Sequence, residues 1–327
     1  MKCINKILSG FLIISLSVSF AACGSDSKEI KITNRYDVFQ EDYLSQNKTA
    51  NQNDYFATGL CVGGTENIGM DATDSQVAEG AGVFNTVTGE IPYAQNIYEK
   101  LYPASTTKIL TAYIAIKYGN LSDVVTVSQN ALDIDPDSST CGLAVGDQMT
   151  LQDLLYGMMM KSGNDAAVAI AEYISGDTAS FADKMNEEAK KLGATNSHFV
   201  NPNGLPDDNH YTSVYDLYLI FQAATQNETF AQIIGTKDYT TNYTDATGAA
   251  KTQEWNSTNQ YFTGDETAPD GFTVIGGKTG TTGEAGYCLV LLSQNPSGQP
   301  LISIVLKADC KSNLYLLMNQ MLAGYGK

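Results

Sequence analysis

The sequence predicts a mixed α/β (α+β) fold: an antiparallel sheet flanked by terminal helices, with a helical subdomain inserted between its strands. Two observations lead to this fold class. Apolar runs typical of strands occur at 78–96 and again at 271–308, toward the two ends of the folded region. The segments between them have helical periodicity instead. With 327 residues, 43% of them hydrophobic, the chain is long enough to bury a large core.

The first folded elements are expected to be a strand pair and a buried helix. Residues 78–96 predict two strands around a turn at Thr88 and Gly89. Pro103 then opens a helix that ends near Gly119. Because this helix is apolar on nearly every side, we expect it to be buried.

Helices are predicted for the middle of the chain. Thr150 begins the helix TLQDLLYGMMM, with Asp153 as an approximate capping-box partner. The tetrapeptide KSGN, residues 161–164, interrupts the helical pattern. Further helices are expected at 165–176, 180–193 and 212–224, with a loop at 196–211.

The C-terminal part changes to strands. Strands are predicted at 271–280, 285–293 and 300–308, with a turn at 295–299, followed by a last helix that reaches the C-terminus. These strands and those of the N-terminal pair are expected to form one sheet, which the terminal helix covers.

The N-terminus predicts export. Lys2 and Lys6 precede a short apolar run that ends in Ala21-Ala22-Cys23-Gly24, which is typical of a secretory signal. This ending resembles a bacterial lipoprotein signal, in which the cysteine is acylated, although Phe20 departs from the pattern and leaves ordinary cleavage open. We expect a signal peptide at 1–22, a lipid-anchored polar tether at 23–56 and a globular domain at 57–327.

Charge and cysteine content limit the classes of function. The formal charge of −17 argues against a nucleic-acid partner, since phosphate contacts need a basic face. No CxxC spacing occurs and the chain has two histidines, so a metal site is not expected. Beyond the signal region, the cysteines are Cys61, Cys141, Cys288 and Cys310. They are either disulfide partners or apolar core residues, and the sequence does not decide which.

The first of three short motifs is SxxK, at Ser105 and Lys108. Residues three apart share one face of a helix, so the two side chains can touch. A serine hydroxyl is a poor nucleophile until a base takes its proton. A lysine becomes such a base when burial and a nearby like charge lower its pKa. The simpler alternative is a lysine that extends to water.

The second and third motifs supply further polar groups. Ser162-Gly163-Asn164 lies between two helices, where it either ends a helix or projects a hydroxyl and an amide into a cleft. The third motif, Lys278-Thr279-Gly280-Thr281, follows a predicted strand. Its lysine and hydroxyls suit a carboxylate, and its backbone N–H at Thr281 could join that of Ser105 in an oxyanion hole. The alternative is an ordinary turn with a solvated lysine.

In the order SxxK, SxN, KTG, the motifs resemble those of penicillin-binding proteins and class A β-lactamases. From about residue 70 onward the chain resembles the serine D-Ala-D-Ala carboxypeptidases, the low-molecular-weight penicillin-binding proteins. The resemblance rests on four segments: LYPASTTKILTAYIA, GMMMKSGNDAAVAIAE, FVNPNGLPDDNHYTSVYDL and GGKTGTTGEAGY.

The resemblance implies a role for each motif residue. Ser105 would attack the peptide bond between the two terminal D-alanines of a peptidoglycan stem peptide, with Lys108 as base and Ser162 as proton relay. Asn164 would position the acyl part, and Lys278 would keep Lys108 neutral. Thr279 and Thr281, joined by Gly280, would hold the terminal carboxylate. β-Lactam antibiotics would acylate Ser105, and no cofactor would be needed.

Several alternatives remain open from the sequence. A class A β-lactamase would need a glutamate that the stretch 195–215 lacks. Endopeptidase or transpeptidase action differs only in leaving group or acceptor. A lipid-anchored sensor that binds cell-wall peptide without turnover would not need both the lysine and the SxN serine. A Ser-His-Asp triad would use His198 or His210, which flank a loop typical of the family.

Anchoring through Cys23 would replace the C-terminal membrane helix of many relatives.

Overall fold

The computed structural model describes residues 59–327. The predicted signal peptide and the whole of the predicted tether, Cys23 included, lie outside the described residues. Within residues 59–327, no helix is both long enough and apolar enough to cross a membrane.

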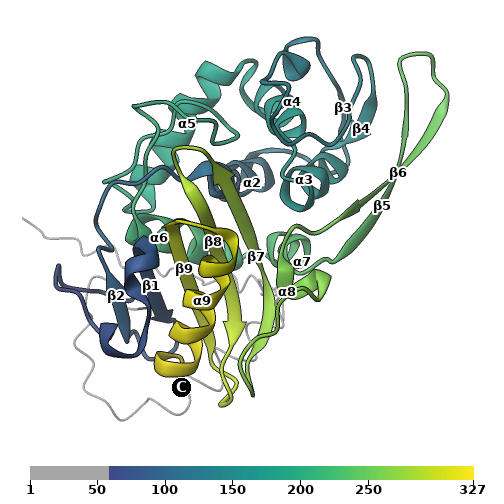
Figure 1. The fold of residues 1–327 in the computed structure, drawn as a ribbon. Helices are drawn as coiled ribbons and strands as arrows, with labels where there is room; N and C mark the ends of the chain where they lie inside the picture. The colour runs from purple at the N-terminus through teal and green to yellow at the C-terminus, as the bar shows by residue number, and fades with distance from the viewer. Residues whose placement is uncertain (1–58) are drawn as a thin grey trace, which may run out of the picture.

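A five-stranded antiparallel sheet forms the centre of the fold, in the order β2-β1-β9-β8-β7 (Figure 1). Its strands are β1 (Ala78–Asn85), β2 (Tyr93–Gln95), β7 (Thr273–Thr282), β8 (Gly286–Gln294) and β9 (Pro300–Ala308). Strands from both ends of the folded chain therefore pair directly, with Val83 opposite Ser303 in the β1–β9 ladder. The predicted antiparallel sheet is confirmed.

The two faces of this sheet bury different cores. Along β9, Leu301 and Val305 pack under the C-terminal helix α9 (Lys311–Tyr325), whereas Ile302 and Ile304 belong to the larger core on the opposite face. The strand period of two explains this alternation. Because both faces are covered, β8 and β9 are nearly continuous apolar runs in the sequence.

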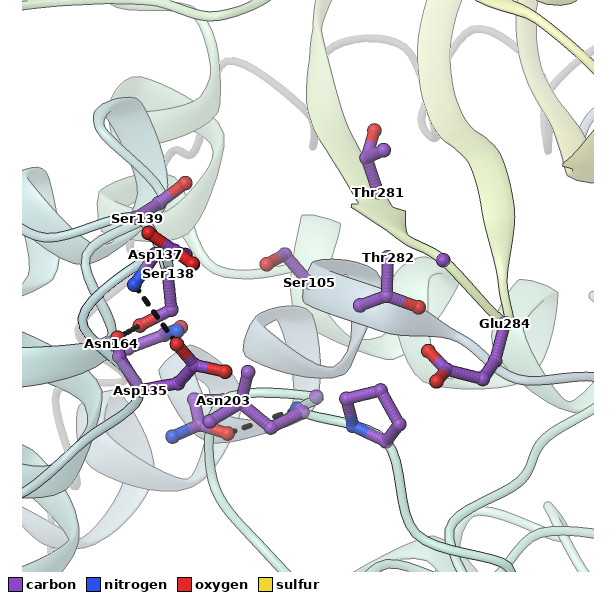
Figure 2. A pocket seen from close by; sticks show the side chains of 14 residues that line it. Ser105, Asp135, Asp137, Ser138, Ser139, Asn164, Asn203, Thr281, Thr282 and Glu284 are labelled. Atoms are coloured by element: carbon purple, nitrogen blue, oxygen red, sulfur yellow. Dashed lines mark hydrogen bonds between the residues drawn. The ribbon is translucent and has the colours of Figure 1, made fainter.

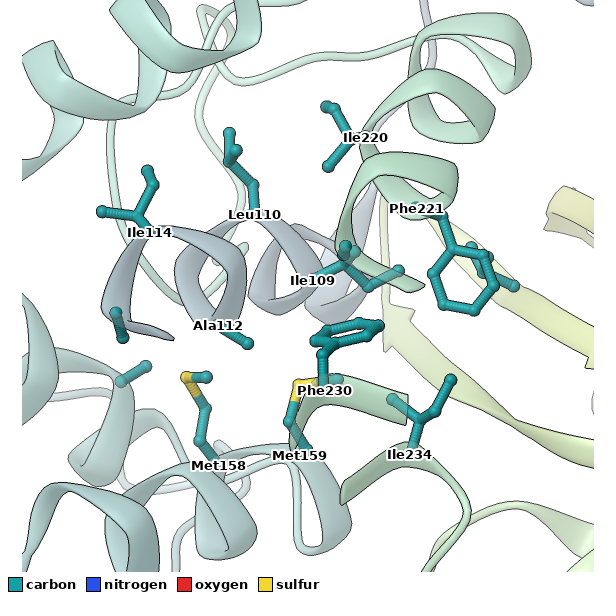
Figure 3. Close-up of a cluster of buried hydrophobic side chains, with 14 of the residues drawn as sticks. Ile109, Leu110, Ala112, Ile114, Met158, Met159, Ile220, Phe221, Phe230 and Ile234 are labelled. Carbon is teal, nitrogen blue, oxygen red and sulfur yellow. The ribbon is translucent and has the colours of Figure 1, made fainter. Parts of the chain in front are cut away.

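The helical subdomain lies beside the sheet and is built around a buried helix, α2 (Figure 1). Its α-helices are α2 (Lys108–Tyr118), α3 (Leu151–Met160), α4 (Asn164–Ser175), α5 (Thr178–Lys191), α6 (Val214–Thr225) and α7 (Glu228–Ile234). The short helix α8 (Gln260–Thr263) packs against α9 instead, through Tyr261 and Tyr315. Short 3₁₀ turns occur at η1 (Met70–Ala72), η2 (Ser75–Val77), η3 (Ala104–Thr107) and η4 (Asn130–Leu132). Figure 3 shows Ile109 and Ala112 of α2 surrounded by side chains of α3, α6 and α7.

Two helix starts were predicted, at Thr150 and at Pro103, and the structure confirms the first but shows a different kind of helix at the second. The Thr150 hydroxyl caps α3 by accepting from the Asp153 N–H at 3.0 Å, as predicted. Pro103, however, precedes a 3₁₀ turn rather than the first turn of an α-helix. In a 3₁₀ turn residues i and i+3 eclipse each other, which places Ser105 directly over Lys108.

A second sheet was not predicted from the sequence. It has the strand order β3-β4-β5-β6 and consists of β3 (Val124–Thr126), β4 (Gln148–Thr150), β5 (Asp238–Thr244) and β6 (Ala250–Asn256). Each of the two longer strands buries one side chain, Thr241 in β5 and Trp255 in β6. With so little apolar alternation, the pattern used to find strands is absent from them.

The four cysteines of the described residues are free thiols. Cys61, Cys141 and Cys288 are buried, and Cys310 is partly exposed. Of the two alternatives that the sequence left open, the structure supports apolar packing rather than disulfide pairing.

Candidate active site

Ser105 lies in the tight 3₁₀ turn η3, directly before helix α2. The residue before it, Ala104, has a left-handed backbone with φ of 48°. Residues other than glycine rarely adopt this conformation, and such strain concentrates at functional sites. Strand β7 packs against the same turn, so closely that a Cβ on Gly280 would lie 3.0 Å from the backbone nitrogen of Ser105.

Lys108 is fully buried and reaches Ser105. Its Nζ lies 2.9 Å from Ser105 Oγ, 2.7 Å from Asn164 Oδ1 and 2.6 Å from the main-chain oxygen of Asn203. The alternative of a lysine extending to water is therefore wrong. Two of these acceptors are carbonyl-type oxygens, which can only accept, so they hold the Nζ in place.

The surroundings of Lys108 favour its neutral form. Burial, followed by the repulsion of Lys278, lowers the pKa of Lys108 well below its ordinary value of 10.5. A neutral amine has two N–H groups and one lone pair. When Asn164 and Asn203 accept the two N–H groups, the lone pair is left facing the Ser105 hydroxyl. This geometry suits proton transfer from Ser105 to Lys108.

Ser162 and Lys278 form a second buried pair. Lys278 Nζ donates to Ser162 Oγ at 3.0 Å and to the main-chain oxygen of Thr279 at 2.7 Å. Ser162 has a left-handed backbone with φ of 60°. The SxN motif is therefore a strained junction between α3 and α4 rather than a plain helix terminator.

The loop at residues 200–210 holds one of the Lys108 acceptors in place. Thr111 of α2 donates to the main-chain oxygen of Pro202 at 2.6 Å. Gly204 packs so closely on the nucleophile turn that a Cβ there would lie 1.8 Å from the Ala104 oxygen. The sequence did not identify Asn203 as a site residue, because a main-chain carbonyl leaves no side-chain signal. The close approach of Gly204 is the feature that could have indicated it.

His210 fastens the same loop to the nucleophile turn. Its Nε2 lies 2.9 Å from Thr107 Oγ1, and the Val200 N–H donates to its Nδ1 at 3.1 Å. Because Nδ1 accepts, Nε2 carries the proton and donates to Thr107. Burial lowers the pKa of His210 to about 4. No hydrogen bond links either histidine to Ser105 within residues 59–327, which argues against a Ser-His-Asp triad.

Two cavities meet at Ser105. The first cavity, of about 320 Å³, includes Ser105, Asn164, Asp135, Asp137 and Glu284 in its lining. Figure 2 shows Asp135 and Glu284 on opposite sides of it, with Ser105 between them. The second cavity, of about 220 Å³, lies toward α9 and is lined by the nucleophile, hydroxyl-bearing residues and one cation. Ser105, Ser139 and Thr281 line both cavities, so the two are continuous around the nucleophile.

Three residues of the third motif line a cavity, and the fourth, Lys278, is buried. Thr279, Gly280 and Thr281 line the second cavity. Lys278, 1% exposed, lines neither cavity. Thr258, which the sequence did not identify, exchanges a 2.6 Å hydrogen bond with Thr279 and lines the same cavity.

Most of the predicted site residues converge in this structure. Ser105, Lys108, Asn164, Ser162 and Lys278 form two hydrogen-bonded groups, and the first three are linked through Lys108. The predicted lipidation site Cys23 lies outside the described residues. The oxyanion hole of Ser105 and Thr281 stays a prediction, which the close packing of Gly280 on the Ser105 nitrogen supports.

The pair Ser105 and Lys108 and the pair Ser162 and Lys278 lie between an antiparallel sheet and a helical subdomain. This arrangement defines the penicillin-binding fold. The chain belongs to the D-alanyl-D-alanine carboxypeptidase family Peptidase_S11, whose model matches residues 68–310. The resemblance inferred from the motifs is confirmed.

Curated relatives and solved structures agree with this assignment. The chain is 34% identical over 255 residues to the D-alanyl-D-alanine carboxypeptidase DacF of Bacillus subtilis, covering 75% of this chain and 61% of the relative. It is 35% identical over 240 residues to the D-alanyl-D-alanine carboxypeptidase of Streptomyces sp. K15, covering 70% and 80% respectively. A solved serine-to-alanine mutant of the Streptomyces K15 DD-transpeptidase is 32% identical, with a TM-score of 0.71, over 77% of this chain and 98% of that one. The chain thus spans about three-fifths of the length of the Bacillus relative.

Proposed function

We propose that this protein is a serine DD-carboxypeptidase that removes the terminal D-alanine from peptidoglycan stem peptides. The observation that most supports the proposal is the placement of a buried Lys108 Nζ, with lowered pKa, 2.9 Å from Ser105 Oγ. The family and its curated D-alanyl-D-alanine carboxypeptidases supply the substrate class.

The reaction begins with acylation. Ser105 Oγ bonds to the carbonyl carbon between the two terminal D-alanines, while Lys108 Nζ takes the hydroxyl proton. The C–N bond then breaks, and the departing amine of D-alanine takes a proton from the Ser162 hydroxyl. The proton that Lys108 received replaces it on Ser162, so Lys108 is neutral again. The backbone N–H groups of Ser105 and Thr281 stabilise the oxyanion. Asn164, whose Oδ1 already accepts from Lys108, presents its amide to the acyl part in the first cavity.

Hydrolysis of the acyl-enzyme completes the cycle. A water molecule adds to the ester carbon and loses a proton to Lys108. The C–O bond to Ser105 then breaks, and Lys108 returns the proton to Ser105 Oγ. β-Lactams have a strained amide in place of the D-Ala-D-Ala bond, so they acylate the same hydroxyl. Ser105 Oγ has one hydrogen-bond partner within residues 59–327, Lys108, and no carboxylate contacts it. Deacylation of a β-lactam adduct is therefore expected to be slow, unlike that of a β-lactamase.

The test is release of D-alanine from a diacetylated stem tripeptide analogue ending in D-Ala-D-Ala, with wild type against Ser105→Ala. Release by wild type and none by the variant supports the proposal, and equal release contradicts it. A β-lactam mass adduct in wild type that is absent from the variant identifies Ser105 as the acylated residue.

Transpeptidation is a second candidate, because the similar Streptomyces K15 structures are those of a DD-transpeptidase. It would differ in the final step, where an amine replaces water as the acceptor. Adding glycine or a D-amino acid to the same assay distinguishes the two reactions. A new peptide product in place of the hydrolysed one would make transfer the main activity.

The proposal extends to export and a lipid anchor at the extracytoplasmic face of a bacterial membrane. It rests on the basic and apolar N-terminus and on the Ala21-Ala22-Cys23-Gly24 sequence. Residues 24–56 would then be the spacer between lipid and enzyme. Replacing Cys23 by Ala should abolish fatty-acid labelling and move the protein from the membrane to the soluble fraction. Unchanged membrane binding would contradict the anchor.

A further inference from the structure

Asp165 is a buried carboxylate beside the SxN motif, and the proposed mechanism does not use it. It is the second residue of α4 and is 1% exposed. None of the ion pairs within residues 59–327 includes it. Because a buried charge without a cation partner is costly, its presence at this position calls for a physical reason.

Backbone N–H groups surround the Asp165 carboxylate. The Cys141 N–H donates to Oδ1 at 2.8 Å and to Oδ2 at 3.0 Å, and the Leu143 N–H donates to Oδ2 at 3.2 Å. The Ala166 N–H donates to Oδ1 at 2.8 Å. A side chain that accepts from three N–H groups and donates to none behaves as an ionised carboxylate. The start of α4 adds the positive end of the helix dipole, which also favours a negative charge.

These contacts fix the loop at residues 139–143 against α4. The main-chain oxygen of Ser139 accepts from the Asn164 N–H at 2.8 Å. A Cβ on Gly163 would lie 2.8 Å from Asp165 Oδ1 and 3.1 Å from the Cys141 nitrogen, so a larger residue would push the loop away. Ser139 lines both cavities. The Asp165 carboxylate therefore joins part of the cavity wall to the helix that bears Asn164.

The charge of Asp165 also reaches the base. Burial lowers the pKa of Lys108 most and the charge of Lys278 lowers it further, whereas Cys141 and Asp165 act in the opposite direction. Burial raises the pKa of the Cys141 thiol well above its ordinary value of 9.0, so the thiol is uncharged near neutral pH. At neutral pH, Asp165 is then the neighbouring negative charge that opposes Lys278.

A negative charge is needed when the reaction moves a proton. In acylation the Ser105 O–H bond breaks and an N–H bond forms on Lys108, so a neutral buried amine becomes a buried ammonium. Lys278 is a second buried lysine close to it. Repulsion between two ammonium groups is strong in a low-dielectric interior and opposes the transfer. Asp165 offsets it without competing for the proton, because N–H groups occupy both of its oxygens.

We infer that Asp165 is a positioning residue for the acylation step, whose carboxylate holds the loop at residues 139–143 and stabilises the ammonium that forms on Lys108. The inference rests on the proposed function and extends it to a residue that none of the three motifs includes. Asp165 lines neither cavity, so it acts through Lys108 and the loop rather than on the substrate.

The experiment measures the rate of β-lactam acylation against pH in wild type and Asp165→Asn. The variant removes the charge and keeps an oxygen that accepts from Cys141 and Ala166. Losing a negative charge lowers the pKa of Lys108, so the acid side of the profile should move to lower pH by about 1 pH unit. The weaker base should also lower the maximal rate by about 3–10-fold. A merely structural role would lower the rate without moving the profile.

The other titratable groups that face Lys108 are Lys278 from β7, Cys141 from the loop at residues 139–143 and His210 from the loop at residues 200–210. Burial lowers the pKa of His210 to about 4, so neither His210 nor Cys141 titrates near neutral pH. Burial lowers the pKa of Lys278 to about 7. Asp165→Asn is therefore also measured in the Lys278→Met protein, where the same shift to lower pH is expected.

Asp147→Asn is the matched control. Asp147 is 3% exposed, its Oδ2 accepts from the Ala144 N–H at 2.8 Å, and it lines neither cavity. This variant should keep the position of the wild-type profile. Asp165→Glu retains the charge and should also keep that position, even where its rate falls. If Asp165→Asn does not fold, Asp165→Glu decides, since a shift to lower pH in that variant contradicts the inference.

The outcomes separate the inference from the proposed function. If wild type is acylated and releases D-alanine, but the Asp165→Asn profile stays in place or moves to higher pH, the inference is wrong and the proposed function stands. If wild type is neither acylated nor releases D-alanine, both fail. A shift to lower pH in Asp165→Asn, with Asp147→Asn and Asp165→Glu unshifted, supports the inference.

Discussion

The Nζ of Lys108 lies 2.9 Å from the Oγ of Ser105, and Asn164 and Asn203 accept from the same nitrogen. Three distant parts of the chain therefore fix one amine against one hydroxyl. Complete burial makes the charged amine costly, so the arrangement favours the form that accepts a proton.

Replacing Lys108 by Arg should abolish acylation while preserving the positive charge. A guanidinium does not lose its proton in proteins, so it cannot act as the base. We expect the rate of β-lactam acylation to fall by about 10²–10⁴-fold, the range for loss of a general base. Lys184→Arg, on the surface over Tyr118, is the control and should retain the wild-type rate. An active Lys108→Arg protein would exclude Lys108 as the base.

Replacing Lys278 by Met should shift the pH dependence of acylation. The charge of Lys278 contributes to the lowered pKa of Lys108, so removing it should raise that pKa. Activity requires deprotonated Lys108, and the acid side of the profile should therefore move to higher pH. Burial lowers the pKa of Lys278 itself to about 7, so the effect should be largest below that pH.

Ser162→Ala is the control for this shift. It removes the hydrogen bond to Lys278 but keeps the ammonium, so the rate should fall without an upward shift of the profile. A downward shift in Lys278→Met would show that repulsion between the lysines does not set the pKa of Lys108.

Gly204→Ala should damage both stability and activity. Its backbone has a φ of 87°, and the new Cβ would meet the Ala104 oxygen at 1.8 Å. The turn that bears Ser105 must then move. We expect a loss of about 1–3 kcal/mol in the free energy of unfolding, because strain and a backbone clash act together. The rate of D-alanine release should fall by a larger factor than the fraction of protein that is folded.

Gly248→Ala separates backbone strain from the clash. Gly248 has a φ of 82° in the turn between β5 and β6, but no atom lies within 4 Å of its added Cβ. It should cost about 1–2 kcal/mol from backbone strain alone and leave activity unchanged. Equal activity loss in both variants would contradict the proposed contact between Gly204 and the nucleophile turn.

His210 should make stability depend on pH in the acidic range. Burial lowers its folded pKa to about 4 from the ordinary value of 6.5, so between these values the unfolded chain binds more protons. Its contribution is therefore complete above pH 6.5 and is lost as the pH falls toward 4. Urea unfolding at pH 7 and pH 4.5 should show about 2–3 kcal/mol of this loss in wild type.

His210→Gln removes the titrating group and should lose less stability between the two pH values than wild type. Its activity at neutral pH should fall moderately, because the loop still contains Gly204 and Asn203. An identical pH dependence in wild type and variant would show that His210 is protonated equally in both states.

The sequence predicted the parts of the molecule that bury continuous apolar surface. Strands β8 and β9 and helix α2 were found because nearly every residue in them is apolar. Strands β5 and β6 were missed because they form a polar hairpin in which each strand buries a single side chain, so the apolar alternation that indicates a strand is absent.

At the candidate active site, too, the sequence identified some residues and missed others. Ser105, Lys108 and Ser162 are side chains in recognisable motifs, so the sequence identified them. Asn203 acts through its main-chain oxygen, which accepts from Lys108 Nζ. That contact joins residues 95 positions apart, so it is not local in sequence.

One measurement tests the central claim most directly: D-alanine release and β-lactam acylation measured on wild type and Ser105→Ala, with the adduct located by peptide mass mapping. The account predicts release by wild type, an adduct on the peptide containing Ser105, and neither in the variant. Release that persists in Ser105→Ala, or an adduct on another residue, would contradict it.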